Sequence, residues 1–421
     1  MNSLFSPNDV SPDAVNVDFT PTRDASLARL RAFASAMGST YTRERNTDYG
    51  PEDRSNVSAL SPWVRTRCLL ESELVEAALE RFAFSTAEKF IEEVCWRSYF
   101  KGWLEHRPAV WRSYAKRVRE AHDRLANDDA LRKRYEQAIG GETGIDAFDA
   151  WAGELVEFGY LHNHARMWFA SIWIFTLELP WELGADFFLQ HLMDGDAASN
   201  TLSWRWVAGL HTPGKTYLAR PSNIRKHTAD RFTGEGVASE APPAEGDKNP
   251  PIDSLREGDV PPDGDVALLV TEEDTHVETL RPAGATIRGV AGVAFPHGRS
   301  PAGCGEPAGR FVHGAVDDAL RRAAEHDDVT TRRLDAEDDL ADALEAFARS
   351  LNVDTIITGF APVGWVRPRV DKARHALANR GVQLLYLQRE WDRGLWPHAT
   401  RGFFKLKKQI RPTLQAIGFA V

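Results

Sequence analysis

Cysteine is scarce in this chain of 421 residues, and long hydrophobic runs are missing. The three cysteines, Cys68, Cys95 and Cys304, are far apart and form no CxxC pair, which indicates reduced thiols in a cytoplasmic protein. No apolar stretch reaches the ~18 consecutive residues that a membrane-spanning helix requires, so we expect no membrane partner. The first residues, MNSLFSPNDVSPD, have neither a basic leader nor an apolar core, and we expect no secretory signal there.

Two common phosphate-binding loops and an excess of positive charge are also missing. The sequence contains neither GxGxxG nor GxxxxGK followed by Ser or Thr. The net charge of −10 argues against a protein that coats nucleic acid indiscriminately, although it does not exclude a local basic face. Residues 204–232 could form such a basic face, because Asp230 is their only acid among several lysines and arginines. A simple solvated surface is the alternative.

Helical periodicity dominates the first half of the chain. Apolar residues recur at three- and four-residue spacing in 69–82, 87–104 and 165–177, and strand-like alternation is scarce. Residues 21–232 are therefore predicted to form an all-helical domain. The polar, proline-punctuated residues 1–20 are predicted to be a flexible N-terminus.

The second half of the chain has a different pattern. Residues 233–264 are rich in Pro, Gly, Glu and Asp and cannot bury enough apolar surface to offset their ordering entropy, so we predict a linker. After it, strand-length apolar runs alternate with amphipathic helical patterns, which predicts a parallel sheet covered by helices. The sequence thus predicts a multidomain α and α/β protein with a Rossmann-like domain at residues 265–421. The expected strands are 266–271, 289–295, 353–359 and 382–387, and the expected helices are 316–326, 338–351 and 370–380.

Metal-binding patterns are weak. His162 and His164 are two residues apart, so on a helix they would point away from each other. Asp194-Gly-Asp196 is followed by no further carboxylate at the spacing of a calcium loop. We therefore expect no metal site.

Several sequence blocks, taken in order and with their spacing, resemble the flavin domain of the DNA photolyase/cryptochrome family. The resemblance covers roughly residues 21–232 and implies a helical FAD-binding domain of photolyase type. The blocks are the pair Tyr41 and Arg45, SALSP at 58–62, EEVCWRSYF at 92–100, TG at 143–144, HNHARM at 162–167, LPWELG at 179–184 and DGDAASNTLSWRW at 194–206.

The resemblance implies a set of FAD-binding residues. Arg97 has the position of the phosphate-binding arginine, whose guanidinium can fork onto a diphosphate. Arg166 and Asp194 correspond to an ion pair beside the flavin ring, although a purely structural buried pair remains an alternative. Asn200 corresponds to the residue facing a ring nitrogen, where an amide can hydrogen-bond but cannot deliver a proton as an acid would. The full set is Tyr41, Ser58, Leu60, Ser61, Arg97, Arg166, Asp194, Asp196 and Asn200.

The resemblance also implies a route for electrons. Trp204 and Trp181 match the inner two members of the tryptophan chain that reduces the photoexcited flavin, whereas tryptophan in a helical domain otherwise serves core packing. No tryptophan stands near residues 126–135, where the third member is expected. Tyr135, Trp111 or Trp173 could substitute for it.

Other residues match positions that contact a pyrimidine dimer or its DNA. Glu93 matches the carboxylate that hydrogen-bonds to the dimer and is therefore a candidate catalytic residue, together with Asn200, Trp181 and Trp204. His164 stands where enzymes for this lesion usually carry arginine, and ARPSN at 219–223 replaces a DNA-contacting block. The candidate DNA-binding residues are Arg45, Trp96, Asn163, His164, Met167 and Trp206.

The function that the resemblance implies is that of a deoxyribodipyrimidine photolyase, a lyase. In such an enzyme, blue light excites reduced FAD, and an electron passes to a cyclobutane pyrimidine dimer in DNA and splits it. The alternatives are a cryptochrome-like blue-light photoreceptor without repair activity and a flavin-bound remnant that binds DNA without catalysis. The family's α/β antenna domain normally precedes the flavin domain, so a swapped domain order is expected here, with a second, antenna chromophore left open.

Overall fold

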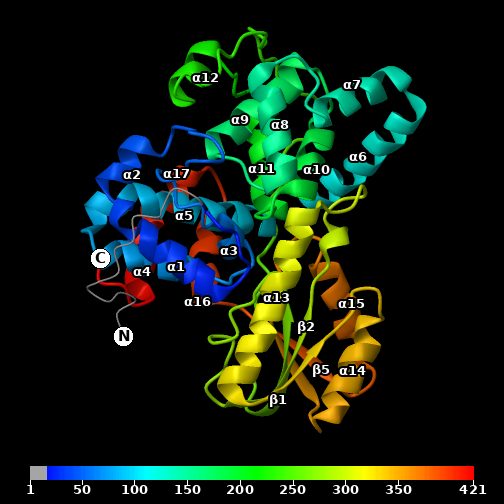
Figure 1. Ribbon diagram of the computed structural model, residues 1–421. Coiled ribbons are helices and arrows are strands. Elements are labelled where there is room, and N and C mark those ends of the chain that lie inside the picture. Colours follow the sequence, from blue (N-terminus) through cyan, green and yellow to red (C-terminus); the bar gives the residue numbers. More distant parts are fainter. Residues whose placement is uncertain (1–16) are drawn as a thin grey trace.

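The computed structural model describes residues 17–421, a helical region that is followed by an α/β region (Figure 1). The predicted helical first half is confirmed. Its helices are α1 (Arg23–Phe33), α2 (Ser39–Glu44), α3 (Ser61–Arg65), α4 (Glu71–Leu79), α5 (Phe84–Glu105), α6 (Pro108–Asn127), α7 (Asp129–Ile139), α8 (Asp146–Phe158), α9 (Asn163–Ser171), α10 (Trp181–His191), α11 (Ala197–Val207) and α12 (Pro221–His227).

Polar caps and buried aromatic rings explain why these segments are helical and how they pack. Thr22 accepts a hydrogen bond from the Ala25 N–H at the start of α1, and Asp128 accepts one from the Leu131 N–H at the start of α7. The core is rich in aromatic rings, which accounts for much of the chain's tryptophan. Its fully buried tryptophans in this region include Trp63, Trp151, Trp168, Trp173 and Trp204.

Most of the predicted flexible N-terminus lies outside the described residues. The part that the structure describes is held in place. Phe19 packs against Trp63 and Tyr160 with ring centroids 5.6 and 5.3 Å apart, and the Thr20 carbonyl accepts a 2.9 Å hydrogen bond from the Trp63 indole. The prediction of flexibility is therefore wrong for residues 17–20, because an aromatic side chain anchors them.

A parallel five-stranded sheet forms the centre of the α/β region, in the order β3-β2-β1-β4-β5. This is the strand order of the first five strands of a doubly wound Rossmann sheet, so the predicted Rossmann-like architecture is confirmed. The elements are β1 (Gly264–Thr271), β2 (Ala285–Val293), α13 (Glu306–Asp327), β3 (Thr330–Arg333), α14 (Leu340–Ser350), β4 (Thr355–Gly359), α15 (Arg367–Ala378), β5 (Gln383–Leu387), α16 (Glu390–Leu395) and α17 (Phe403–Ala416).

Strand β1 is buried on both faces, as parallel strands usually are. Leu268 and Val270 join the apolar cluster that includes residues of α13, whereas Ala267 and Leu269 join the cluster that includes residues of α14 and α15. Helices therefore cover both sides of the sheet. Among residues 17–421, the structure contains no helix long and apolar enough to cross a membrane.

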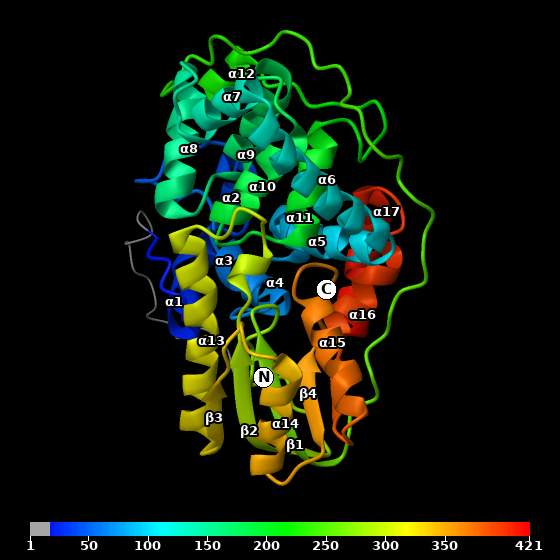
Figure 2. The same cartoon turned by 90° about the vertical axis from the view of Figure 1, so that its right-hand side faces the viewer.

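Residues 233–263 contain neither helix nor strand, as the predicted linker requires, and run along the outside of the molecule from α12 to β1 (Figure 2). They are nevertheless attached at several points. The backbone N–H groups of Ala244, Asp253 and Asp259 donate to carbonyls of Ala208, His106 and Tyr386 at 2.8–3.0 Å. The linker thus binds both regions.

The two regions meet through buried ion pairs, here called the interdomain ion network. Arg65, fully buried at the end of α3, donates to the Glu273 carboxylate at 2.8 Å and to the Glu272 carbonyl at 3.1 Å. Arg67 donates to both carboxylate oxygens of Asp392 in α16 at 2.7 Å. The members of the network are Arg65, Arg67, Glu71, Arg97, Lys101, Asp196, Glu272, Glu273, Asp274 and Asp392.

Replacing Arg67 with Met should destabilise the protein strongly. The substitution keeps most of the side chain's volume but removes the cation that Asp392 contacts, and breaking a buried ion pair in this way costs about 3–5 kcal/mol. Denaturant unfolding followed by circular dichroism measures the loss. Arg310→Ala on the exposed side of α13 is the control and should change the unfolding free energy by less than about 0.5 kcal/mol. An equal, small effect of both substitutions would contradict this role of the network.

Candidate functional site

Arg166 and Asp194 form a two-point ion pair, as the sequence predicts. Nη1 and Nη2 of Arg166, on α9, donate to the two carboxylate oxygens of Asp194 at 3.0 and 2.8 Å. Ser61, at the start of α3, donates its hydroxyl to Asp194 at 2.5 Å. Ser61 is exposed and the Arg166 side chain is 24 % exposed, so this cluster borders accessible space. Three predicted flavin-binding residues are thus brought together.

The beginning of α11 supplies two more predicted residues. Asp196 caps the helix by accepting hydrogen bonds from the Ala198 and Ser199 N–H groups, both at 2.9 Å. Burial alone would raise the pKa of Asp196, but the positive charges of Lys101 and neighbouring arginines outweigh it and hold that pKa well below the usual range. Asn200 is buried, and its amide nitrogen donates to the Ala185 carbonyl at 2.8 Å, which fixes the orientation of the amide.

Arg97 lies next to this cluster, and its guanidinium already has protein partners. It contacts Asp196 at 3.2 Å, Glu71 at 3.4 Å and the Arg65 carbonyl at 3.3 Å. A diphosphate at Arg97 would therefore compete with two carboxylates. Its role as the diphosphate ligand stays a prediction.

Helix α2 and the loop before α3 contain three more predicted flavin-binding residues, Tyr41, Ser58 and Leu60. The Tyr41 ring packs edge-on against Phe90 at 5.2 Å, and Leu60 is buried. Arg29 fixes the loop from inside, because its guanidinium donates to the carbonyls of Ser58, Val57 and Arg54 at 2.7–3.0 Å. Burial lowers the pKa of Arg29 to about 10. Sequence reasoning missed Arg29, since it holds the loop through backbone carbonyls, which leave no sequence pattern.

The polar groups of this site match the chemistry of FAD at one end of the cofactor better than at the other. A hydroxyl from α3 and a cation from α9 meet at the Asp194 carboxylate, in the loop before α11, and this polar cluster with its exposed hydroxyl suits the polar edge of a flavin ring. The indole nitrogens of Trp181 and Trp204 are buried without hydrogen-bond partners. The ring end therefore fits FAD, whereas the diphosphate end fits only if Arg97 turns from Glu71.

The candidate DNA-binding residues lie on several elements. Arg45 contacts Glu93 at 3.6 Å, so a predicted phosphate contact and the predicted catalytic carboxylate lie together. The Trp96 ring stacks on Phe403 of α17, with centroids 3.8 Å apart and planes 9° from parallel. Trp206 stacks on Tyr217 at 5.4 Å. Of the remaining three, Asn163 is exposed, and His164 and Met167 are partly buried.

The two histidines of the HNHARM block lie close together. His162 is the N-cap of α9 and lies outside the helix, so the prediction that it points away from His164 is wrong. The two rings lie 6.0 Å apart and 15° from parallel, and the His227 ring lies 5.7 Å from His164 on α12.

Aromatic contacts extend outward from the two predicted inner tryptophans. The ring centroids of Trp204 and Trp173 lie 6.3 Å apart, and those of Trp173 and Tyr135 lie 6.0 Å apart. A second line runs from Trp181 through Tyr114 at 5.7 Å to the partly exposed Trp111 at 5.3 Å. All three candidate substitutes for the missing tryptophan thus lie in aromatic lines that start at Trp204 or Trp181.

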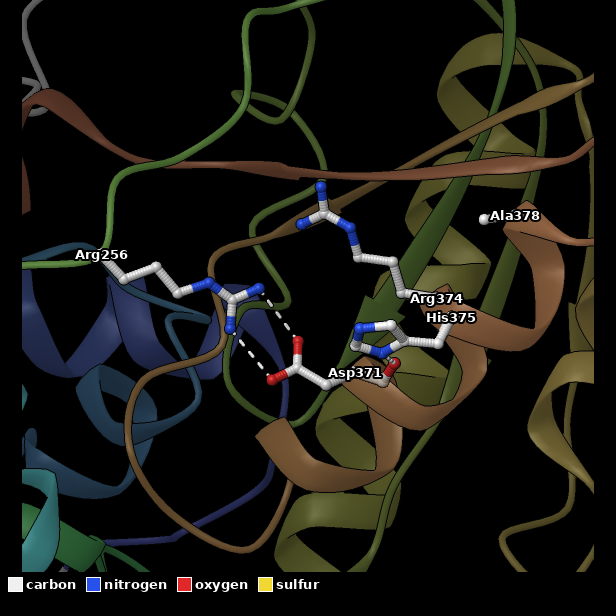
Figure 3. A pocket seen from close by; sticks show the side chains of 5 residues that line it. All are labelled: Arg256, Asp371, Arg374, His375 and Ala378. Atoms are coloured by element: carbon white, nitrogen blue, oxygen red, sulfur yellow. Dashed lines mark hydrogen bonds and ion pairs between the residues drawn. The ribbon is translucent and has the colours of Figure 1, made fainter.

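A pocket of about 370 Å³ lies elsewhere, on α15 (Figure 3). Arg256 of the linker points toward Asp371 and forms a two-point ion pair with it at 2.9 and 3.0 Å. Arg374 donates to Asp259 of the linker at 2.8 Å. These charges are already paired with one another, and the ion pairs attach the linker to α15.

Comparison with known proteins shows what the helical region resembles. Residues 90–231 match the model of the FAD binding domain of DNA photolyase. A deoxyribodipyrimidine photo-lyase from Streptomyces griseus is 32% identical over 255 residues, which cover 55% of this chain and 54% of that protein. A cryptochrome DASH from Idiomarina loihiensis is 27% identical over 217 residues, 50% of this chain and 46% of its own. The chain spans about half the length of these curated relatives.

Two solved structures are also similar. A bacterial class III photolyase from Agrobacterium tumefaciens has 24% identity and a TM-score of 0.41, over 55% of this chain and 52% of its own. A Synechocystis cryptochrome has 22% identity and a TM-score of 0.38, over 51% and 46%. The family-model match shows that residues 90–231 of the helical region are similar to the FAD binding domain of DNA photolyase. The chain is thus similar in sequence to members of the photolyase/cryptochrome family.

Acid should destabilise this protein through its buried histidines. Burial lowers the pKa values of His162, His164 and His211 to about 4, from 6.5. Between these pH values the unfolded chain binds more protons than the folded one, so stability is full above pH 6.5 and is lost as the pH falls toward 4.

Replacing His211 with Gln should reduce that loss by up to about 1.4 kcal/mol per pH unit. Unfolding free energies measured across this pH range check the difference. His297→Gln is the control, since that side chain is exposed. Identical profiles for wild type and the His211 variant would show that this histidine does not cause the pH dependence.

Proposed function

We propose that this chain is an FAD-dependent, blue-light-driven cyclobutane pyrimidine dimer photolyase. The observation that carries the proposal is the cluster of Ser61, Arg166 and Asp194, in which Arg166 and Asp194 belong to residues 90–231 that match the FAD binding domain of DNA photolyase. FAD, when bound, supplies the light absorption and the electron. The relatives named deoxyribodipyrimidine photo-lyase support DNA with pyrimidine dimers as the substrate.

In the proposed site, the protein's groups hold and polarise the cofactor. Arg166, oriented by both oxygens of Asp194, supplies a fixed positive charge that favours an electron-rich ring. The Asn200 amide nitrogen is used by Ala185, which leaves its oxygen as an acceptor. Both groups are set before the cofactor binds and need little rearrangement.

On the DNA side, Glu93 is the proposed catalytic carboxylate. Arg45 lies 3.6 Å from one of its oxygens, and Lys89 lies 3.5 Å from the same oxygen. These cations orient Glu93 for hydrogen bonding to a dimer that has left the duplex, an extrusion that is cheaper at damaged pairs. Trp96, Asn163, His164, Met167 and Trp206 complete the proposed DNA-contacting set.

A cryptochrome-like photoreceptor without repair is the second candidate. It is favoured by His164, which is stacked between His162 and His227 and has its pKa lowered to about 4 by burial, so it offers DNA no positive charge at neutral pH. The relative named cryptochrome DASH is compatible with this reading. In both cases we propose a cytoplasmic protein, with an antenna chromophore in the α/β region left open.

Removing the Arg166 charge should release the flavin. Arg166→Ala leaves Asp194 without its two-point partner beside the ring, and we expect flavin content after purification to fall at least about tenfold, a loss of ~1.4 kcal/mol of binding free energy. Flavin absorbance per mole of protein measures this. Arg117→Ala, which breaks an ion pair with Glu182 on the outer side of α10, should keep the flavin. A wild-type protein without flavin would rule out both candidate functions.

Glu93→Ala should slow dimer repair while flavin content stays unchanged. The dimer would lose a hydrogen bond that it donates to a carboxylate, and we expect a repair rate lower by about tenfold or more, since hydrogen bonds to charged groups contribute ~1.5–3 kcal/mol. Blue light, reductant and a dimer-containing oligonucleotide provide the assay. Glu92→Gln is a neighbouring control, because Glu92 is bound by Lys89 and Lys407. If wild type removes no dimers, the photoreceptor replaces the photolyase as the proposed function.

A further inference from the structure

The last part of the chain has a charge opposite to that of the whole protein. Residues 393–421 contain no aspartate or glutamate, although the chain carries a net charge of −10. The cations of this segment are Arg393, Arg401, Lys405, Lys407, Lys408 and Arg411. Such a local excess of positive charge indicates that this segment binds an anionic partner.

Helix α17 divides these residues between two faces. Its apolar face, with Phe403, Leu406, Ile410 and Leu414, is buried in the core that includes residues of α5. The opposite face is exposed and carries Lys405, Lys408 and Arg411 together with Phe404, whose surface is 77 % exposed. Arg401 is exposed just before the helix. The basic face of α17 is defined by these five residues.

Lys407 does not belong to the basic face. It pairs with Glu92 and lies 3.5 Å from Glu88, and both acids are on α5. A pocket of about 590 Å³ between α5 and α17 is lined by these two acids and also by Phe404, Lys408 and Arg411 of the basic face, so its charge is mixed. Arg401 and Lys405 are the cations of the basic face that do not line this pocket.

The basic face begins beside the proposed dimer site. Phe403, the first residue of α17, stacks on Trp96, and Phe404 and Lys405 follow directly. Helix α17 also packs along α5, the helix that carries Glu93 and Trp96 (Figure 1). A strand of DNA that reaches Trp96 would thus pass close to α17.

We infer that the basic face of α17 binds the phosphate backbone of DNA next to the proposed lesion site. From Lys405 to Arg411 the helix rises about 9 Å, at ~1.5 Å per residue, which corresponds to about two to three steps of ~3.4 Å along the axis of a duplex. Phe404 offers an exposed ring on which an unpaired base can stack. The inference deepens the proposed function, on which it rests for DNA as the partner.

An anionic membrane is less suited to this face. A helix that lies in a membrane surface must present a broad apolar face to the lipid, and here that face is already buried against the protein. Phe404 is the single large apolar side chain of α17 that is exposed. The chemistry of the face therefore favours nucleic acid.

The test removes three cations from the basic face and compares DNA binding with a charge-matched control. The test variant is Arg401→Ala, Lys405→Ala and Lys408→Ala; the control is Lys133→Ala, Arg310→Ala and Lys372→Ala, three exposed cations on α7, α13 and α15. Fluorescence anisotropy with undamaged duplex DNA, in the dark and over a range of salt concentrations, gives the affinity of each. Circular dichroism confirms that both variants are folded.

We expect the test variant to bind DNA about tenfold more weakly at low salt, with a salt slope smaller by about 2–3, since each phosphate contact contributes ~0.9. The control should match wild type. Unchanged binding by the test variant, an equal loss in the control, or binding only to vesicles of phosphatidylserine and phosphatidylcholine would overturn the inference. The DNA is undamaged and no light is used, so a failure of repair would leave this result unaffected.

Discussion

The interdomain ion network is the constraint on which the arrangement of this molecule depends. Arg65 and Arg67 extend from the end of α3 into the α/β region, where Glu273 and Asp392 receive them at 2.7–2.8 Å. A buried charge without its partner costs several kcal/mol, so each region is complete only when the other is docked. Specific pairing of this kind also fixes how the regions are oriented, because a small rotation would separate Arg67 from both oxygens of Asp392.

The network has a consequence for the α/β region. In doubly wound sheets, ligands usually bind outside the carboxyl ends of the strands where the strand order reverses, which here is between β1 and β4. Glu272, next after β1, accepts a hydrogen bond from the Trp365 indole at 2.9 Å and lies 3.7 Å from Arg65. The helical region therefore occupies the usual ligand position. An antenna chromophore there would have to displace a buried arginine, so any such pigment needs another place.

Sequence reasoning succeeded where the pattern is local. Apolar periodicity predicted the helical half. Short apolar or β-branched runs predicted strands at β1, β2, β4 and β5, whereas β3 was missed because Thr330–Arg333 is a short, polar edge strand. The Arg166–Asp194 pair was found through the resemblance of two sequence blocks. Long-range partners could not be predicted, since nothing in the sequence around Arg97 indicates Glu71, and nothing in residues 233–264 indicates the carbonyls to which the linker binds.

The same long-range contacts show that residues 21–232 do not form the proposed site alone. Helix α5 carries Glu93, Trp96 and Arg97, and the end of the chain supports it along its length: the Trp391 indole donates to Ser98 at 2.7 Å, and Phe403 stacks on Trp96. The orientation of the Trp96 ring is thus set by a residue more than three hundred positions later. Because those contacts come from the α/β region, helix α5 is supported from the opposite end of the chain, and the proposed site depends on both regions.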